Sequence, residues 1–319
     1  MRAPHPAFDA PPVRLITRTV LHHTFLAEMA WRGAFEGHHQ SMLMWLSTDL
    51  ANTEHLFEQQ DLTSLVREGR LGDERRRPIA VRALGATLGL DVETTRRWTN
   101  RLVERGLCER VADGLIVRSS TYEREDIAPA AHASLEVLSA LFREFARWNI
   151  AFPDRPEVID RRPWESEHAN PGFVRQLFVL LFLKFILRFS VETRAIFEHN
   201  TMTASVFLCV FSANHRPFFE DDELNLRYAS WETLVPAELR EPISIRAVAK
   251  RMGYPVETIR RHANRLSHTG FLEKRGGGYV VPTNTMAAPG LIKGVTDVNA
   301  SIMMMVRRMD RVAAALAAG

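Results

Sequence analysis

One stretch of the sequence occurs twice, and this repeat limits what the chain can fold into more than any other feature. Residues 78–118 align without a gap with residues 242–282, at a constant offset of 164, as from Pro78 to Pro242. Roughly four positions in ten are identical. A long fixed period indicates duplication of a whole structural module rather than the short repeat of a solenoid. We therefore expect one chain to contain two copies of the same fold.

Each copy has the pattern of two short helices followed by a β-hairpin. In the first copy, residues 81–88 and 92–106 have apolar residues at helical spacing, with Gly89 between them as a left-handed helix end. Strands are expected at 107–111 and 115–118, around a turn at 112–114. The second copy predicts helices at 245–252 and 256–270 and strands at 271–274 and 279–281. This order is that of a winged helix-turn-helix, here called module 1 (77–118) and module 2 (241–282).

The duplication extends beyond the modules in both directions. Upstream, helices are expected at 13–36, 41–51, 61–70 and 177–189, and Phe35-Glu36 and Ala51-Asn52 match Phe197-Glu198 and Ala213-Asn214 at an offset of 162. Downstream, a helix follows each hairpin, and the C-terminal helix has apolar heptad positions at Val298, Ile302, Met305, Met309, Val312 and Leu316. These observations divide the chain into a disordered lead-in (1–12), a first unit (13–150), a linker rich in proline and charge (151–172) and a second unit (173–319). The expected fold class is mostly α with small β-hairpin wings: two tandem winged helix-turn-helix units flanked by helices.

Composition and motifs narrow the classes of function. The 319 residues have 46% hydrophobic residues and a net charge of only +3, so local rather than global charge must indicate partners. The two cysteines lie far apart without metal spacing, which suits a reducing cytoplasm, and we expect neither a signal peptide nor a membrane-spanning run. There is no Walker loop, nucleophile elbow or dinucleotide-binding glycine motif. We expect a cytoplasmic, nucleoid-associated protein that is not an enzyme and needs no cofactor.

The second helix of each module has basic and amide side chains away from its apolar face. Arginine pairs with guanine edges and phosphates, and asparagine with adenine, because each can form two parallel hydrogen bonds in the major groove. Residues 77–118 contain eight Arg and Lys against five Asp and Glu, and residues 241–282 contain eight against three. The expected DNA-binding residues are Thr94, Arg96, Arg97, Asn100 and Arg101 in module 1, and Thr258, Arg260, Arg261, Asn264, Arg265, Lys274 and Arg275 in module 2. If only one module binds DNA strongly, the more basic module 2 is the better candidate.

The motifs RALGATLGLDVETTRRWTNRLVERGLCER and RAVAKRMGYPVETIRRHANRLSHTGFLEK resemble the winged helix of bacterial transcriptional regulators of the MarR, IclR and GntR type. The resemblance covers about a quarter of the chain. It implies that the second helix of each module is a recognition helix, that the wing touches the DNA backbone or minor groove, and that flanking helices dimerise or hold an effector. By resemblance, the base-reading positions are Arg96, Arg97 and Asn100, and Arg260, Arg261 and Asn264.

Other features have a structural and a functional interpretation. The histidines His22, His23, His38, His39, His55, His199 and His215, with Glu36 or Glu198, could form a metal site, but none has metal-ligand spacing, and scattered surface or capping histidines are the favoured interpretation. Aromatic and methionine side chains could line a small-molecule effector pocket, although core packing is favoured. The C-terminal heptads predict either a homodimer interface or a brace on their own unit.

We interpret the chain as a sequence-specific double-stranded DNA-binding protein, a bacterial transcriptional regulator whose two recognition helices enter successive major grooves of an imperfect inverted repeat. One alternative is a plasmid or phage replication initiator, which would bind direct repeats at an origin. A second alternative makes the winged helices protein–protein modules. The second alternative predicts acidic or apolar second helices, and the paired arginines disfavour it.

Overall fold

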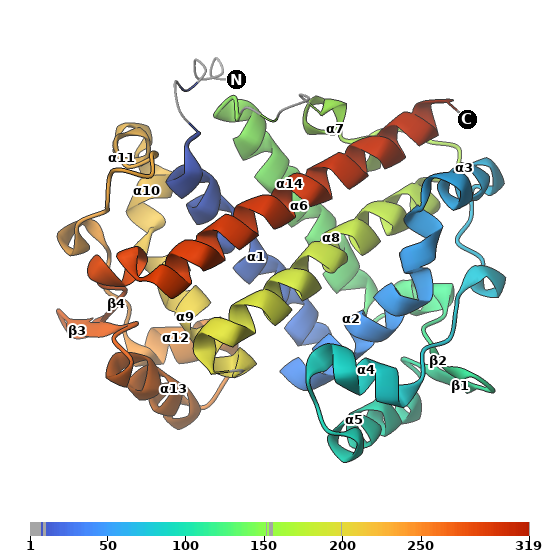
Figure 1. The fold of residues 1–319 in the computed structure, drawn as a ribbon, viewed down its shortest axis with the longest axis horizontal. Helices are drawn as coiled ribbons and strands as arrows, with labels where there is room; N and C mark the ends of the chain where they lie inside the picture. Colours follow the sequence, from blue (N-terminus) through green and yellow to red (C-terminus); the bar gives the residue numbers. More distant parts are fainter. Residues whose placement is uncertain (1–7, 9–10, 151, 153–155, 199, 319) are drawn as a thin grey trace. The chain divides into compact units, whose positions relative to one another are not determined.

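The computed structural model describes residues 8, 11–150, 152, 156–198 and 200–318. Most of the described chain is helical, and two small antiparallel hairpins provide its β-structure (Figure 1). In this described part, no helix is both long and apolar enough to cross a membrane. The expected class, mostly α with small hairpins, is therefore confirmed. The predicted disordered lead-in, 1–12, lies outside the described residues except for Phe8, Pro11 and Pro12.

The elements of the first half follow the order expected from the sequence. They are α1 (Val13–Ala34), α2 (His39–Thr53), α3 (Gln59–Glu68), α4 (Val81–Leu88), α5 (Val92–Glu104), β1 (Glu109–Val111), β2 (Gly114–Ile116) and α6 (Ala128–Arg147). The region 13–36 forms one helix, and α4 has the bounds that the sequence predicts. The first strand is shorter than the expected 107–111, because Leu107 and Cys108 donate their backbone N–H groups to Leu102 O and so close the end of α5.

The second half repeats this order after a short helix. Its elements are α7 (Glu157–Asp160), α8 (Pro171–Arg194), α9 (Thr201–Asn214), α10 (Arg216–Glu220), α11 (Asp222–Arg227), α12 (Ile245–Met252), α13 (Val256–His268), β3 (Glu273–Arg275), β4 (Gly278–Val280) and α14 (Pro289–Ala318). The offset of 162 is also seen in the backbone, since Glu36 and Glu198 both adopt positive φ, at 53° and 50°. The matched halves thus share an unusual backbone conformation as well as an element order.

The expected linker, 151–172, contains ordered and buried structure where it is described. Val158 and Ile159 of α7 are buried, and so is Trp164. The indole of Trp164 donates to Ser139 Oγ at 2.8 Å, and the backbone N–H of Val158 donates to Asp310 at 2.9 Å. The proline and charge content of this segment therefore hides apolar residues that pack against distant parts of the chain.

The compact units of the structure do not coincide with the sequence division at 13–150 and 173–319. The unit that contains module 1 consists of residues 30–139, 156–188 and 304–319. The unit that contains module 2 consists of residues 1–29, 140–155 and 189–303. The boundary between these units falls inside α1, α6, α8 and α14. Each compact unit is therefore built from segments of both halves.

The core of each unit forms around a helix that is buried on nearly every side. This helix is α2 in the module-1 unit and α9 in the module-2 unit, and the buried side chains of both include polar as well as apolar ones. Trp31, Trp45 and Phe35 are fully buried in the module-1 unit, and the Trp31 and Trp45 rings stack 5.2 Å apart. The buried helix provides the floor on which each module packs, as α5 packs on α2 and α13 on α9.

A buried asparagine joins that helix to its module in the same way in both halves. Asn52 donates to Arg77 O and Leu115 O, at 2.7 and 3.0 Å, and accepts from the N–H of Val117 at 2.8 Å. Asn214 donates to Glu241 O and Tyr279 O, at 2.7 and 3.1 Å, and accepts from the N–H of Val281 at 2.9 Å. Each amide thus fixes both the chain entering the module and the outer hairpin strand.

The C-terminal helix buries its heptad side chains inside this chain. Val298, Ile302, Met305, Met309 and Val312 are each at most 4% exposed, and Leu316 near the helix end is half-buried. These positions therefore pack within the monomer. A homodimer through α14 stays a prediction.

Candidate nucleic-acid interface

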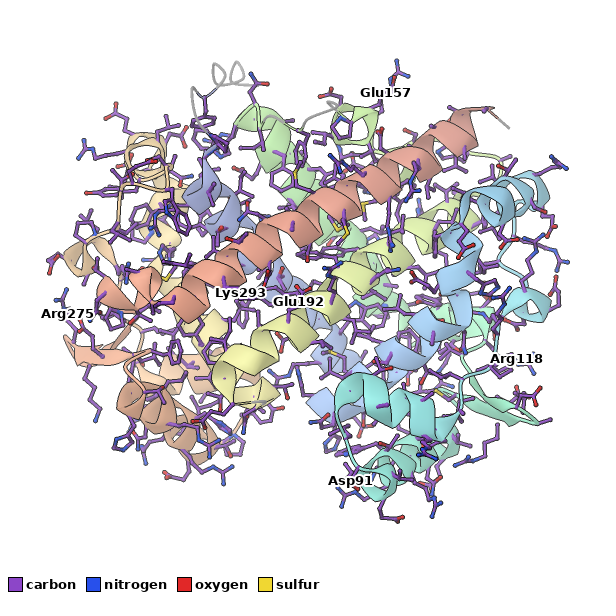
Figure 2. The ribbon with its side chains drawn as sticks, viewed as in Figure 1. Asp91, Arg118, Glu157, Glu192, Arg275 and Lys293 are labelled. Atoms are coloured by element: carbon purple, nitrogen blue, oxygen red, sulfur yellow. The ribbon has the colours of Figure 1, made fainter. Side chains whose placement is uncertain are left out.

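Local sequence explains how each module places its second helix. Gly89 and Gly253 adopt left-handed φ angles of 60° and 67° and end α4 and α12, as the sequence predicts. Asp91 then begins α5 by accepting from the N–H of Thr94 at 2.8 Å, and Figure 2 labels it at that end of the helix. In module 2 the cap lies on the first helix instead, where Ser244 accepts from the N–H of Ala247 at 3.2 Å.

One face of each second helix is buried and the opposite face is exposed. In α5 the buried side chains are Thr95, Thr99 and Leu102. In α13 they are Ile259, His262, Ala263 and Leu266. The repeat spacing of three and four residues turns the basic residues of both helices toward solvent.

The expected site residues of module 1 lie on this exposed face. Arg96, Arg97, Asn100 and Arg101 are exposed, and Thr94 is half-buried. Arg96 makes an ion pair with Glu93 at 3.4 Å, one turn earlier. The guanidinium of Arg101 lies 4.7 Å from the centre of the Trp98 ring, and that of Arg97 lies 5.9 Å from it. The ring therefore packs against the guanidinium of Arg101 while leaving its N–H donors free.

Module 2 presents the same pattern with fewer internal partners. Arg260, Arg261, Asn264 and Arg265 are exposed, Thr258 is half-buried, and Arg260 pairs with Glu257 at 2.5 Å. Among the residues that the structure describes, Arg261, Asn264 and Arg265 have no hydrogen-bond or ion-pair partner for their side chains. In module 1 the same holds for Arg97 and Arg101. These guanidinium and amide groups are available to a ligand.

The hairpins contribute cations beside the second helices. Lys274 on β3 is exposed, with its ammonium 5.9 Å from the centre of the Tyr279 ring. Arg275, labelled in Figure 2, is half-buried and pairs with Glu238 at 3.2 Å and with Glu273 at 3.7 Å. Of these two expected residues, Lys274 is thus free to meet a phosphate, whereas Arg275 is already neutralised.

Sequence reasoning missed Arg110 on β1. It occupies the position that matches Lys274 at the offset of 164, is exposed, and donates to the side-chain oxygen of Asn100 on α5. This contact ties the hairpin of module 1 to its second helix. The repeat alignment could have identified Arg110, because it is the position in module 1 that matches Lys274.

A backbone bridge holds each hairpin against the start of its module. Ile79 pairs with Leu115, and Ile243 pairs with Tyr279. The approach is close enough that a Cβ at Gly114 would lie 2.3 Å from Ile79 O, and one at Gly278 would lie 2.9 Å from the Ile243 backbone. Glycine at both positions therefore permits the hairpin to lie where it does.

The two second helices differ most at one matched pair. Trp98 is half-buried and has its ring 6.0 Å from that of His38. Its counterpart His262 is buried and has its Nδ1 2.9 Å from Thr203 Oγ1 on α9. Burial, and then the charges of Arg261 and Arg265, lowers the pKa of His262.

The histidines that the sequence raised as possible metal ligands do not form a metal-binding group in the part of the chain that the structure describes. Within the described ranges, no three His, Cys, Asp or Glu side chains form a group that could hold a metal ion, and His199 lies outside those ranges. Cys108 and Cys209 are both free thiols and buried. Burial, followed by the charge of Asp49, raises the pKa of the Cys108 thiol to about 12, so this thiol is unreactive at neutral pH.

No protein-family model, no curated protein and no solved structure matches this chain.

Proposed function

We propose that the chain binds double-stranded DNA in a sequence-specific manner and regulates transcription, with modules 1 and 2 acting as winged helix-turn-helix domains. In this proposal α5 and α13 are the recognition helices, and the hairpins contact the phosphate backbone. Arg110 and Lys274 are the hairpin residues that we assign to phosphates, since both are exposed cations at matched positions.

The observation that carries this proposal is the set of uncommitted donors on two matched helices. Arg97 and Arg261 are exposed at the same position of α5 and α13 and lack an ionic partner in the described chain. A helix of this kind fits the major groove, where a guanidinium can make a bidentate contact with guanine. A face that served only solubility would be expected to mix both charges, but the acids of these helices are confined to the ends, at Glu93, Glu104 and Glu257.

The primary test is selection of a bound duplex from a random pool, followed by titration of its affinity against salt. If the two modules together meet about six phosphates, log Kobs should fall against log salt with a slope of about −5. A slope near zero, or a pool from which no sequence is enriched, would contradict the proposal.

The second test replaces Arg97 or Arg261 with alanine in the full chain. Each loss of a bidentate base contact should cost about 1–3 kcal/mol, or roughly 5- to 150-fold in Kd, and relax specificity in one half-site only. Arg161→Ala is the matched control, because Arg161 is an exposed arginine directly after α7, outside both modules. Equal losses for all three variants would show that only general positive charge is involved.

A further inference from the structure

The module-2 unit contains a small cavity with three arginines on its wall. The cavity has a volume of about 20 Å³ and lies between α1, α9 and the segment that leads into α12. Its lining includes Arg14, Arg18 and Arg240 together with Phe211, Met286 and Val295. All three arginines are buried, at 9%, 2% and 3% exposure.

Every hydrogen-bond acceptor of these arginines is neutral. Arg14 donates to Trp231 O at 3.1 Å, and Arg240 donates to Val235 O and Val281 O. Arg18 donates to the backbone oxygens of Asn225 and Tyr228, at 2.9 and 2.8 Å, and to the side-chain oxygen of Asn225. The Nε–H groups of Arg18 and Arg240 are buried and have no acceptor in the described chain.

The surrounding charges do not compensate this cluster. Glu232 acts on Arg14, and Glu238 and Glu273 act on Arg240, but each does so from beyond ion-pair distance. Burial, and then Arg14 and Arg240, lowers the pKa of Arg18 to about 9, and burial lowers that of Arg240 to about 10. Both stay cationic at neutral pH. A cluster of buried like charges without a counter-ion is strongly unfavourable.

The module-1 unit shows how the equivalent arginine is neutralised. Arg76, which matches Arg240 at the offset of 164, is buried and pairs with Asp49 at 2.5 Å and with Asp73 at 3.3 Å. The hydroxyl of Tyr122 donates to the other oxygen of Asp49. At the matched positions, the module-2 unit has Phe211 for Asp49, Ala237 for Asp73 and Met286 for Tyr122. Two of these replacements, Phe211 and Met286, line the cavity.

We propose that this cavity binds a compact anion, either a chloride ion or the carboxylate group of an organic acid. The anion would take the place of the carboxylate that Asp49 supplies in the module-1 unit. A volume of about 20 Å³ holds one group of roughly the size of a water molecule. The free Nε–H groups of Arg18 and Arg240 are the donors to it. This inference is independent of DNA binding.

The test is the thermal stability of the full chain as the anion is changed. Sodium chloride and sodium acetate are titrated separately at a constant ionic strength of about 0.15 M, balanced with the bulky anion 2-(N-morpholino)ethanesulfonate. A ligand that binds only the folded chain raises Tm along a saturation curve. Response to chloride alone identifies an inorganic ion, and a stronger response to acetate identifies a carboxylate ligand.

Two variants and one control make the result specific. Arg240→Met should abolish the saturable rise, whereas Arg216→Met, at an exposed arginine of α10, should keep it. Phe211→Asp supplies an internal carboxylate, so the Tm of this variant should not respond to either anion. The same substitution should destabilise the chain less when Arg240 is present than when it is combined with Arg240→Met. If Phe211→Asp does not fold, Arg240→Met decides.

A direct measurement covers the case in which Arg240→Met also fails to fold. Broadening of the chloride-35 resonance by the unmodified chain, reversed by competing acetate, would support the site. The proposal is overturned if neither anion gives a saturable rise in Tm of the unmodified chain, or if the rise is the same in a folded Arg240→Met variant. In the absence of folded variants, the same consequence follows if the unmodified chain broadens neither the chloride-35 resonance nor the proton resonance of acetate.

Discussion

At the scale of single residues, Asn52 and Asn214 connect the buried helix of each unit to the backbone of its module. Each side chain uses its two donors and its acceptor on main-chain groups that belong to different segments. The main-chain groups in these bonds lie at the entry and exit of the module, so the amide fixes the position of the whole module by three bonds.

Replacing Asn52 or Asn214 with alanine should therefore destabilise the protein. One carbonyl and one N–H would be left without partners in a buried place, and a second carbonyl would keep only its bond from Ile79 or Ile243, at a cost of about 3 kcal/mol in the free energy of unfolding. Chemical denaturation followed by circular dichroism measures this cost. Asn284→Ala is the control, since Asn284 is exposed. A loss no larger than that of the control would show that the three bonds are replaceable by water.

Buried histidines make stability depend on pH. Burial, and then the charges of His23 and Arg251, lowers the pKa of His22 from 6.5 to about 4, and His22 Nδ1 lies 2.7 Å from Ser212 Oγ. Burial likewise holds the pKa of His215 well below 6.5. As pH falls below 6.5, these histidines bind protons in the unfolded chain but not yet in the folded chain. Their contribution to the free energy of unfolding is therefore fully present above pH 6.5 and is lost as pH falls toward 4.

His22→Gln should flatten this loss. One proton less is taken up on unfolding, so the slope of unfolding free energy against pH should fall by up to about 1.4 kcal/mol per pH unit between pH 6.5 and 4. Urea denaturation at several pH values gives the slope. His132→Gln, at a histidine whose side chain is 71% exposed, is the comparison. If both variants keep the slope of the unmodified chain, His22 is not a source of the pH dependence.

Sequence could predict exposed residues better than buried polar ones. The arginines of α5 and α13 follow from helical spacing, because a face opposite to Leu102 or Leu266 must meet solvent. The contacts of Asp49 with Arg76 and Tyr122 could not be predicted, since they join residues from three separate segments and their spacing carries no pattern. Arg76 pairs with carboxylates, whereas Arg240 donates only to backbone oxygens in the described chain. This difference appears only when the folded contacts of the two units are compared.

At the scale of elements, helix ends were predictable where a local residue determines them. Gly89 and Gly253 end their helices by adopting a left-handed conformation, and this requirement is visible in the sequence. The folded, buried structure of α7 and of the residues around Trp164 was not predictable, because their partners Asp310 and Ser139 are distant in the chain. Local composition there indicates a loop, and tertiary packing overrides it.

The close approach at each hairpin gives a prediction for Gly114. Gly114→Ala places a methyl group 2.3 Å from Ile79 O, at a φ of 146° that a side chain disfavours. The hairpin must shift, and the free energy of unfolding should fall by about 2 kcal/mol or more. Gly290→Ala is the control, since no atom lies within 4 Å of the added methyl in α14, and it should be neutral or stabilise by about 0.5–1 kcal/mol. Similar stability of the two variants would mean that the hairpin is loosely held.

At the scale of the whole molecule, the two compact units exchange segments between the repeated halves. The module-2 unit needs residues 1–29 and 140–155 of the first half, and the module-1 unit needs residues 156–188 and 304–319 of the second. The repeat alignment predicts that two modules exist, but it cannot predict this exchange. The alignment shows which segments match, but not which half each segment packs with.

Dividing the chain tests this organisation. Residues 1–155 and 156–319, produced as separate polypeptides, should each lack a cooperative unfolding transition, because each is missing segments of the unit that contains its module. Mixing them should restore helical circular dichroism and a cooperative transition. The intact chain is the reference. A separate piece that unfolds cooperatively with the stability of the intact chain would contradict the exchange.

The exchange of segments also constrains how such a gene can change. After most duplications one copy can be deleted or can decay while the other keeps working. Here each compact unit contains segments of both halves. We therefore expect a deletion of either half to remove parts of both units, so that the two copies are inherited together. Differences between the copies, such as Phe211 at the position that matches Asp49, then persist within a pair that cannot be separated.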